Sequence, residues 1–185
     1  MDFTNQFLIA MPSLGDPNFS RTVTYICAHS DDGAMGIVIN RPLELGITEV
    51  FDHLSIEYDQ HTQFDANVMM GGPVETQCGF VIHDPLPEQR WEAVIQVSGG
   101  LSIATSRDIL VAMAAGHGPK RALVALGYAG WGAGQLESEV LDNAWLSGPA
   151  STAVVFDCPH AQRWRKAAEL MGVDVDRLST MAGHS

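Results

Sequence analysis

Residues 22–39 have the sequence TVTYICAHSDDGAMGIVI, and this stretch decides between two kinds of sheet. Its first part, Thr22 to Ala28, is rich in β-branched and aromatic residues, and a second apolar run extends from Met35 to Ile39. Asp31-Asp32-Gly33 separates the two runs, and an Asp-Gly turn in that position is a strong hairpin signal. The stretch therefore predicts two antiparallel strands, which disfavours a regular doubly wound parallel sheet.

Similar patterns on both sides of this hairpin predict the other elements. Short apolar runs bounded by turn residues predict strands, and these are Phe7 to Met11, Phe80 to Ile82, Ala93 to Val97, Leu101 to Ala104, Ala122 to Leu126 and Thr152 to Phe156. Periodic apolar positions and capping residues predict helices, and these are Ile47 to Leu54, Ser106 to Ala115, Gln135 to Asn143 and a last helix capped by Asp157. Thr105 with Asp108 has the spacing of a capping box.

The mixture of elements predicts an α+β fold, in which a mixed, mainly antiparallel sheet curls into a pseudo-barrel with flanking helices. No linker, internal repeat or low-complexity tract interrupts the pattern, so residues 1–185 are expected to form a single domain. Apolar residues make up 46% of the chain and charged residues only 17%, which is typical of a globular protein.

The charge of the chain bears on its partners. Twenty-two acidic residues oppose ten Lys and Arg, for a net charge of -12, so phosphate backbones would be repelled and direct nucleic-acid binding is disfavoured. No run approaches the roughly 18 apolar residues of a membrane span, and the first residues lack the basic region of a signal peptide. We therefore expect a cytoplasmic protein that makes no contact with membranes.

The cysteines and histidines give no strong sign of metal or disulfide chemistry. Cys27, Cys78 and Cys158 are odd in number and widely spaced, which fits neither a disulfide framework nor a zinc ribbon. No metal and no cofactor is expected. Cys27 and His29 are two residues apart on a predicted strand, where their side chains would share one face and the imidazole could lower the thiol pKa. A buried, inert cysteine beside a surface histidine is the competing interpretation.

The last predicted helix carries the basic cluster Arg163, Arg165 and Lys166, which could meet a phosphate or an acidic partner. An ordinary solvated helix face is the alternative. Motifs for nucleotide phosphates, for zinc peptidases and for serine hydrolases are absent from the sequence.

The most unusual stretch extends from Gly127 to Glu139, with four glycines in eight positions between a predicted strand and a predicted helix. Backbone N–H groups could converge there on an anion. It is not a dinucleotide-binding motif, and Glu137 and Glu139 would oppose a phosphate. The alternative is a tight turn beneath two aromatic rings, with Glu137 complementing the helix dipole.

Several longer motifs occur together, namely Phe7-Leu8-Ile9-Ala10-Met11-Pro12, Gly33-Ala34-Met35-Gly36, Asn40-Arg41-Pro42, Gly71-Gly72-Pro73, Thr105-Ser106-Arg107-Asp108 and the stretch from Gly127 to Trp145. With them the chain resembles the YqgE/AlgH family of bacterial proteins over nearly its whole length. The resemblance implies a mixed sheet rolled into a pseudo-barrel and supplies no catalytic residues. Members are often labelled transcriptional regulators of alginate production. The chain has Cys27-Ala28-His29 and Cys78-Gly79-Phe80 where the family pattern has Cys-Glu-His and Arg-Gly-Phe.

These observations lead to three hypotheses of function. The first is a non-enzymatic regulatory or binding protein that acts through a protein or small-ligand contact. The second is a transcriptional regulator that binds DNA directly or indirectly, and the third is an enzyme with an unrecognised pocket formed by Asn40, the Gly71-Gly72 turn and the Gly127 to Glu137 segment. Large rings with polar edges and nearby hydrogen-bonding groups favour a binding surface, and its expected residues are Asn40, Gly71, Gly72, Gly127, Tyr128, Gly130, Trp131, Gln135, Glu137 and Asn143.

Overall fold

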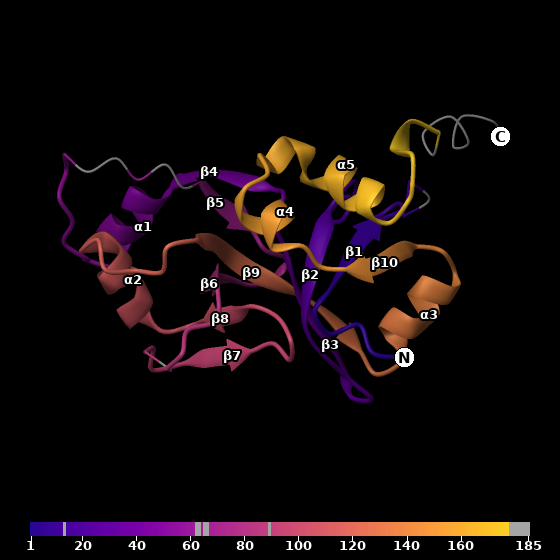
Figure 1. Ribbon diagram of the computed structural model, residues 1–185, viewed down its shortest axis with the longest axis horizontal. Helices are drawn as coiled ribbons and strands as arrows, with labels where there is room; N and C mark the ends of the chain where they lie inside the picture. Colours follow the sequence, from indigo (N-terminus) through magenta and orange to yellow (C-terminus); the bar gives the residue numbers. More distant parts are fainter. Residues whose placement is uncertain (13, 62–63, 65–66, 89, 178–185) are drawn as a thin grey trace.

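The computed structural model describes residues 1–12, 14–61, 64, 67–88 and 90–177 (Figure 1). The strands in this part of the chain are β1 (Gln6–Ala10), β2 (Val23–Ser30), β3 (Gly33–Val38), β4 (Pro42–Gly46), β5 (Asn67–Met70), β6 (Val74–His83), β7 (Val94–Gln96), β8 (Ser102–Ala104), β9 (Ala122–Gly132) and β10 (Trp145–Pro149). The helices are α1 (Ile47–His53), α2 (Arg107–Ala114), α3 (Gln135–Leu141), α4 (Thr152–Phe156) and α5 (His160–Leu170).

The strands form one mixed sheet with the order β10-β1-β2-β3-β9-β6-β8-β7, and β4 and β5 branch from β9. All pairs are antiparallel except β5 with β9. The sheet curls into a half-barrel with helices around it, which confirms the expected α+β architecture (Figure 1). Strand β9 joins the two halves, because its first residues pair with β5 and β6 and its last residues pair with β3.

The predicted hairpin is confirmed as β2 and β3, but it contains a bulge that changes one expectation. Ile26 pairs with Gly36 and Ala28 with Met35, so Cys27 is an extra residue in β2. A bulge reverses the side-chain alternation that follows it. Cys27 therefore points into the core beneath α4 and α5, whereas His29 lies on the opposite face, towards α3. The expectation that these two side chains share one face was wrong.

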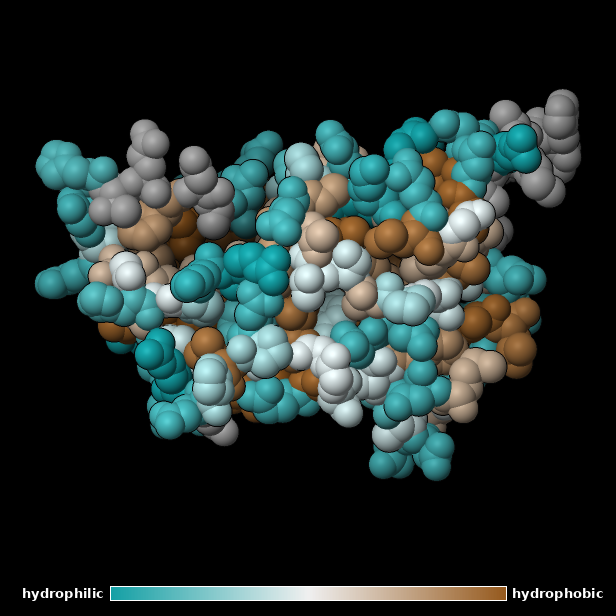
Figure 2. All heavy atoms as spheres, in the orientation of Figure 1, coloured by the Kyte–Doolittle hydropathy of each residue, from teal (hydrophilic) through white to brown (hydrophobic). Residues whose placement is uncertain are grey.

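Three apolar clusters hold the helices against the sheet. Helices α4 and α5 pack with Phe7, Tyr25 and other residues on one face of the β1–β3 half, and α3 packs through Leu136 on the other face. Helices α1 and α2 cover the β6–β9 half, where Phe51 and Ile109 are fully buried. Figure 2 shows a mainly hydrophilic face, with apolar residues emerging in the region of α1 and α2, beneath α5 and at α3.

Two predicted elements differ from the observed ones, and some observed strands were not predicted. The glycine-rich segment after Leu126 continues strand β9 to Gly132 and is not a loop, because glycines fit where strands cross closely. Residues 152–156 form helix α4 and not a strand, because the Ser151 hydroxyl accepts a hydrogen bond from the Val154 N–H and so starts a helical turn. Strands β4, β5 and β10 were not predicted.

Two helix starts also differ. Ser106, and not Thr105, is the N-cap of α2, and the Asp108 carboxylate accepts the N–H groups of Ile109 and Glu92. Asp157 ends α4 and does not cap the last helix, since Pro159 precedes the first residue of α5. In the described residues no helix is both long enough and apolar enough to span a membrane.

Candidate functional site

The expected glycines lie where two backbones cross. Gly71, Gly72 and Gly127 bring the β5–β6 connection against the middle of β9, and the Gly71 N–H donates to the Leu126 carbonyl at 2.7 Å. A Cβ at Gly71 would lie 2.2 Å from the Gly127 carbonyl oxygen, and one at Gly72 would lie 2.1 Å from the Tyr128 carbonyl carbon. These glycines therefore let two stretches of the protein's own backbone approach each other closely.

This crossing also shapes strand β6. Val74 pairs with Tyr128 and Gly79 with Leu126, so four residues, Glu75 to Cys78, stand opposite Gly127 alone. Glu75 has φ +46°, a left-handed conformation that is costly for a residue with a side chain. Long bulges of this kind bend a strand and re-aim its side chains.

Trp131 is held in an aromatic cluster around one carboxylate. Trp131 Nε1 donates to Glu139 Oε2 at 3.0 Å, and Trp145 Nε1 donates to the same oxygen at 2.7 Å. Gln135 Nε2 donates to Glu139 Oε1 at 2.8 Å, and Phe19 packs against both indole rings. Trp131 is only 7% exposed, so its ring is a core group and is not available to a partner.

Glu137 contacts a buried histidine. Its Oε1 lies 2.8 Å from His29 Nε2, and the Phe3 N–H donates to His29 Nδ1 at 3.1 Å. The second bond makes Nδ1 the acceptor, so the proton of the neutral ring is on Nε2 and is donated to Glu137. A hydrogen bond from its own backbone, followed by the bond from His29, lowers the pKa of the Glu137 carboxyl. This pair ties α3 to β2 and to the N-terminal residues.

The remaining expected residues also make local contacts. Asn40 Oδ1 accepts the Val23 N–H at 2.8 Å, and its Nδ2 donates to the Arg21 carbonyl at 2.9 Å. Gly130 pairs with Met35 in the sheet. Asn143 lies just after the C-cap of helix α3 with φ +58°, and its N–H donates to the Val140 carbonyl. Asn40 contacts the first residue of β2, whereas Glu137 contacts His29 near the other end of that strand, so these two residues lie apart. The pocket that was hypothesised for an enzyme stays a prediction.

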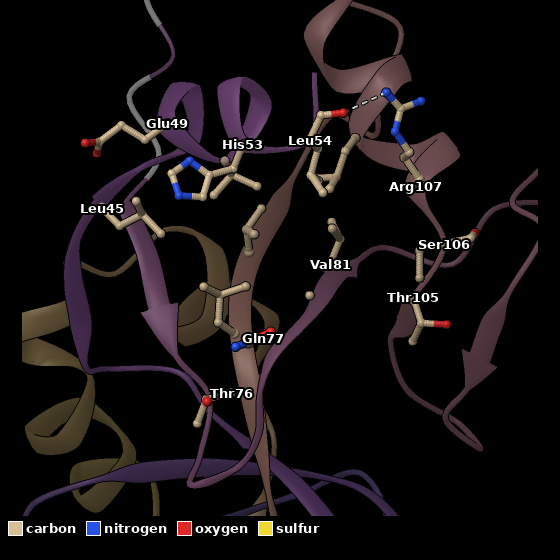
Figure 3. A pocket seen from close by; sticks show the side chains of 16 residues that line it. Leu45, Glu49, His53, Leu54, Thr76, Gln77, Val81, Thr105, Ser106 and Arg107 are labelled. Atoms are coloured by element: carbon tan, nitrogen blue, oxygen red, sulfur yellow. Dashed lines mark hydrogen bonds between the residues drawn. The ribbon is translucent and has the colours of Figure 1, made fainter. Parts of the chain in front are cut away.

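A cavity of about 700 Å³ lies elsewhere, between α1 and α2 and over the β6–β9 half of the sheet (Figure 3). We call it the α1–α2 cavity. Apolar side chains form most of its wall, and they are Leu45, Val50, Leu54, Val81, Ala104, Leu110, Val124 and Leu126. The polar residues that line it are Glu49, His53, Thr76, Gln77, Thr105, Ser106 and Arg107.

The polar groups of this cavity come from separate elements. Figure 3 shows Glu49 and His53 on one side, Thr105 and Ser106 on the other, and Gln77 below them. Arg107 Nη2 donates to the Leu54 carbonyl at 3.0 Å, which ties the start of α2 to the end of α1. An apolar wall with a few polar groups at its edge is the usual composition of a small-ligand site.

The close backbone crossing at Gly71, Gly72 and Gly127 shapes the edge of the α1–α2 cavity. Thr76 and Gln77 belong to the β6 bulge that stands opposite Gly127, and they form the lower edge of the α1–α2 cavity in Figure 3. Gly79, the first residue paired after the bulge, also lines the cavity. The glycines that the sequence singled out therefore position the cavity edge without lining it themselves.

Comparison with known proteins shows which family this chain belongs to. The model of the AlgH-like family, DUF179, matches residues 7–176. The chain belongs to the AlgH-like family. A UPF0301 protein from Thioalkalivibrio sulfidiphilus is 54% identical over 184 residues, which cover 100% of this chain and 97% of that protein.

Two solved structures resemble this AlgH-like chain. The solution structure of the AlgH protein from Pseudomonas aeruginosa matches with a TM-score of 0.78 and 44% identity, covering 100% of this chain and 97% of that one. The crystal structure of a Corynebacterium diphtheriae protein matches with a TM-score of 0.70 and 19% identity, covering 91% and 87%. The second match concerns the fold alone.

Sequence reasoning missed the α1–α2 cavity, although two signals pointed near it. Thr105-Ser106-Arg107-Asp108 carried the resemblance to the AlgH-like family, but it was interpreted only as a helix start. Cys78-Gly79-Phe80 was noted as a departure from the family pattern, and Cys78 proves to be an exposed residue of the bulge. The described residues contain no group of three His, Cys, Asp or Glu side chains placed to hold a metal ion.

The His29–Glu137 contact predicts a pH-dependent effect. The pKa of the Glu137 carboxyl is lowered from its ordinary value of 4.5, so its contribution is complete above that pH and is lost as the pH falls through the folded-state pKa. We expect Glu137→Gln to lower the melting temperature at neutral pH, and the difference from wild type to shrink as the pH falls below 4.5 and through the lowered pKa of Glu137. Glu44→Gln, at an exposed position of β4, is the control; equal effects of the two variants at every pH would contradict the prediction.

Proposed function

We propose that this AlgH-like chain is a regulatory binding protein of the cytoplasm, whose small amphipathic ligand occupies the α1–α2 cavity. The observation that carries the proposal is the cavity itself. Its volume of about 700 Å³ is within the range of roughly 300 to 1,000 Å³ that small-ligand sites occupy. A largely apolar wall of this extent would otherwise remain in contact with water.

The wall indicates the chemistry of the ligand. Val81 and Val124 on the sheet face Val50 and Leu110 on the helices, so the body of the ligand is apolar. Gln77 and Thr76 offer neutral hydrogen-bonding groups at the edge, and Arg107 offers a cation. A ligand with an apolar body and one polar or anionic end satisfies both parts of the site.

A regulatory role follows from where the cavity lies. Its two sides are the short helices α1 and α2, which are joined by Arg107 through the carbonyl of Leu54. Val111 of α2, which does not line the cavity, is 40% exposed on the surface of this pair. A ligand that favours one spacing of the two helices would shift the population towards the conformer with that spacing. A protein partner could then recognise the helix surface of that conformer. The free cysteines fit the reducing cytoplasm.

Direct DNA binding is not part of the proposal. A net charge of -12 opposes a phosphate backbone. A role in gene regulation would then pass through a protein partner, and an electrophoretic shift of duplex DNA at physiological salt by the chain alone would contradict this.

An apolar fluorescent probe tests the binding site. Gly79 lines the cavity, and a Cβ there would have only Leu126 Cδ2 as a neighbour, at 3.9 Å, so Gly79→Leu fills the cavity without a backbone clash. We expect 1-anilinonaphthalene-8-sulfonate to bind wild type saturably with one probe per chain, and Gly79→Leu to bind it at least about tenfold more weakly, a loss of 1.4 kcal/mol.

Gly132→Leu is the matched control, because it places the same side chain on a strand glycine outside the cavity, where a Cβ would have only Gln135 Oε1 as a neighbour, at 3.8 Å. It should bind the probe as wild type does, and both variants should melt within a few degrees of wild type. Equal binding by Gly79→Leu, or no saturable binding by wild type, would overturn the proposed function.

A further inference from the structure

A second cavity, of about 300 Å³, lies on the other side of β9, at the junction of α4 and α5. Strands β5 and β9 contribute one wall, and the turn between the two helices contributes the other. Its polar lining residues are Asn67, Asp157, Cys158, His160 and Arg163. We call it the α4–α5 cavity.

Arg163 is the unusual member of this group. The alternative interpretation of the basic cluster placed it on a solvated helix face with Arg165 and Lys166, but it is only 8% exposed, so that interpretation was wrong for this residue. Its Nε donates to the carbonyls of Val154 and Cys158 at 3.1 and 3.0 Å, and Nη1 donates to the carbonyl of Ile39. These bonds explain why the stem is buried, because they satisfy carbonyls at the end of α4.

Among the described residues, these hydrogen bonds leave the positive charge of Arg163 without a counter-ion and Nη2 of its guanidinium without an acceptor. Within the described part of the chain, no carboxylate lies within ion-pair distance of Arg163, and Nη2 makes no hydrogen bond. Burial lowers the pKa of Arg163. A buried cation without a counter-ion is destabilising, and arginine binds carboxylates and phosphates through two adjacent N–H groups.

The start of α5 adds further donors to the same cavity. Helix α5 has eleven residues, and Pro159 at its N-cap supplies no side-chain hydrogen bond. His160, the first residue of the helix, lines the cavity beside Arg163. The N–H groups of a first helical turn have no partner within the helix and favour an anion.

From these observations we propose that the α4–α5 cavity binds a small oxyanion of the phosphate class, held by Arg163 and by the first turn of α5. The site is separate from the α1–α2 cavity and stands independently of the function proposed there. The other charged group in the lining, Asp157, is 62% exposed at its side chain and lies 3.4 Å from Arg121 Nη1. Its charge is thus partly compensated from outside the cavity.

Titration of the intact protein with inorganic phosphate tests the site. We expect ¹⁵N NMR signals of the Arg163 guanidinium and of the His160 and Ala161 amides to shift saturably, with a dissociation constant on the order of 1 mM. Chloride at the same ionic strength should leave them unchanged. A titration with acetate distinguishes a phosphate site from a carboxylate site. We expect phosphate to bind more tightly than acetate.

The variants are Arg163→Lys and, as a matched control, Arg165→Gln, which removes an exposed arginine of the same helix that is paired with Asp176. Arg163→Lys should weaken phosphate binding at least about tenfold, and Arg165→Gln should not change it. If Arg163→Lys fails to fold, the wild-type shifts decide alone. Shifts that chloride reproduces indicate an adventitious ion only, and they would overturn the proposal, as would the absence of shifts at Arg163.

Discussion

Gly127→Ala is expected to lower the free energy of unfolding by more than about 4 kcal/mol, the largest effect of any substitution considered for this protein. Gly127 has φ +76°, where a residue with a Cβ is strained by about 1 to 2 kcal/mol. A Cβ at this position would also lie 2.4 Å from the Gly72 carbonyl oxygen and 3.1 Å from that of Val74. The crossing of β9 with the β5–β6 connection must open to admit it.

Gly134→Ala separates the two causes. Gly134 has nearly the same conformation, φ +71°, but a Cβ there would have no neighbour within 4 Å. It should therefore cost only about 1 kcal/mol, or roughly 2 to 4 °C in melting temperature, whereas Gly127→Ala should lose more than about 8 °C. Thermal unfolding followed by circular dichroism measures both, and equal effects would show that the close crossing contributes nothing.

Trp131→Ala is expected to have the second largest effect, about 3 to 5 kcal/mol. The ring packs against Phe19 and Trp145, and its N–H is one of the donors that surround the Glu139 carboxylate. Removal leaves a cavity in the cluster and takes a hydrogen bond from a partly buried charge.

Trp131→Phe is the control, because it keeps most of the ring and removes the N–H. It should cost about 1.5 to 3 kcal/mol, the range for a hydrogen bond to a charged group. Urea unfolding measures both variants. If Trp131→Ala unfolded at the same urea concentration as wild type, the ring would be a surface group after all, and the binding surface inferred from the sequence would regain support.

Local patterns predicted the elements that depend on neighbours in sequence. The Asp-Gly turn identified the β2–β3 hairpin, and the apolar spacing of Ile47, Val50 and Phe51 identified α1, where all three are buried. The short apolar run 152–156 was misassigned, because a run of five β-branched and apolar residues has no period that separates a strand from a buried helix.

Such local patterns could not predict the candidate site, because it is built by contacts between residues that are distant in sequence. The glycines near positions 71 and 127 were expected in a binding surface, but the sequence could not show that they approach each other. Likewise, nothing local distinguishes Arg163 from its neighbour Arg165, although one is buried against Ile39 and the other is paired on the surface. Tertiary packing decides which polar residue is structural and which faces a cavity.

The ligand site of the α1–α2 cavity is tested most directly by the contacts of a bound probe. Intermolecular nuclear Overhauser effects between 1-anilinonaphthalene-8-sulfonate and the methyl groups of the intact protein locate the probe without a substitution. We expect contacts to methyl groups of Val81, Leu110 and Val124, which line the cavity from the sheet and from α2. Contacts confined to methyl groups outside this lining, such as the exposed Leu141 and Leu170, would contradict the site.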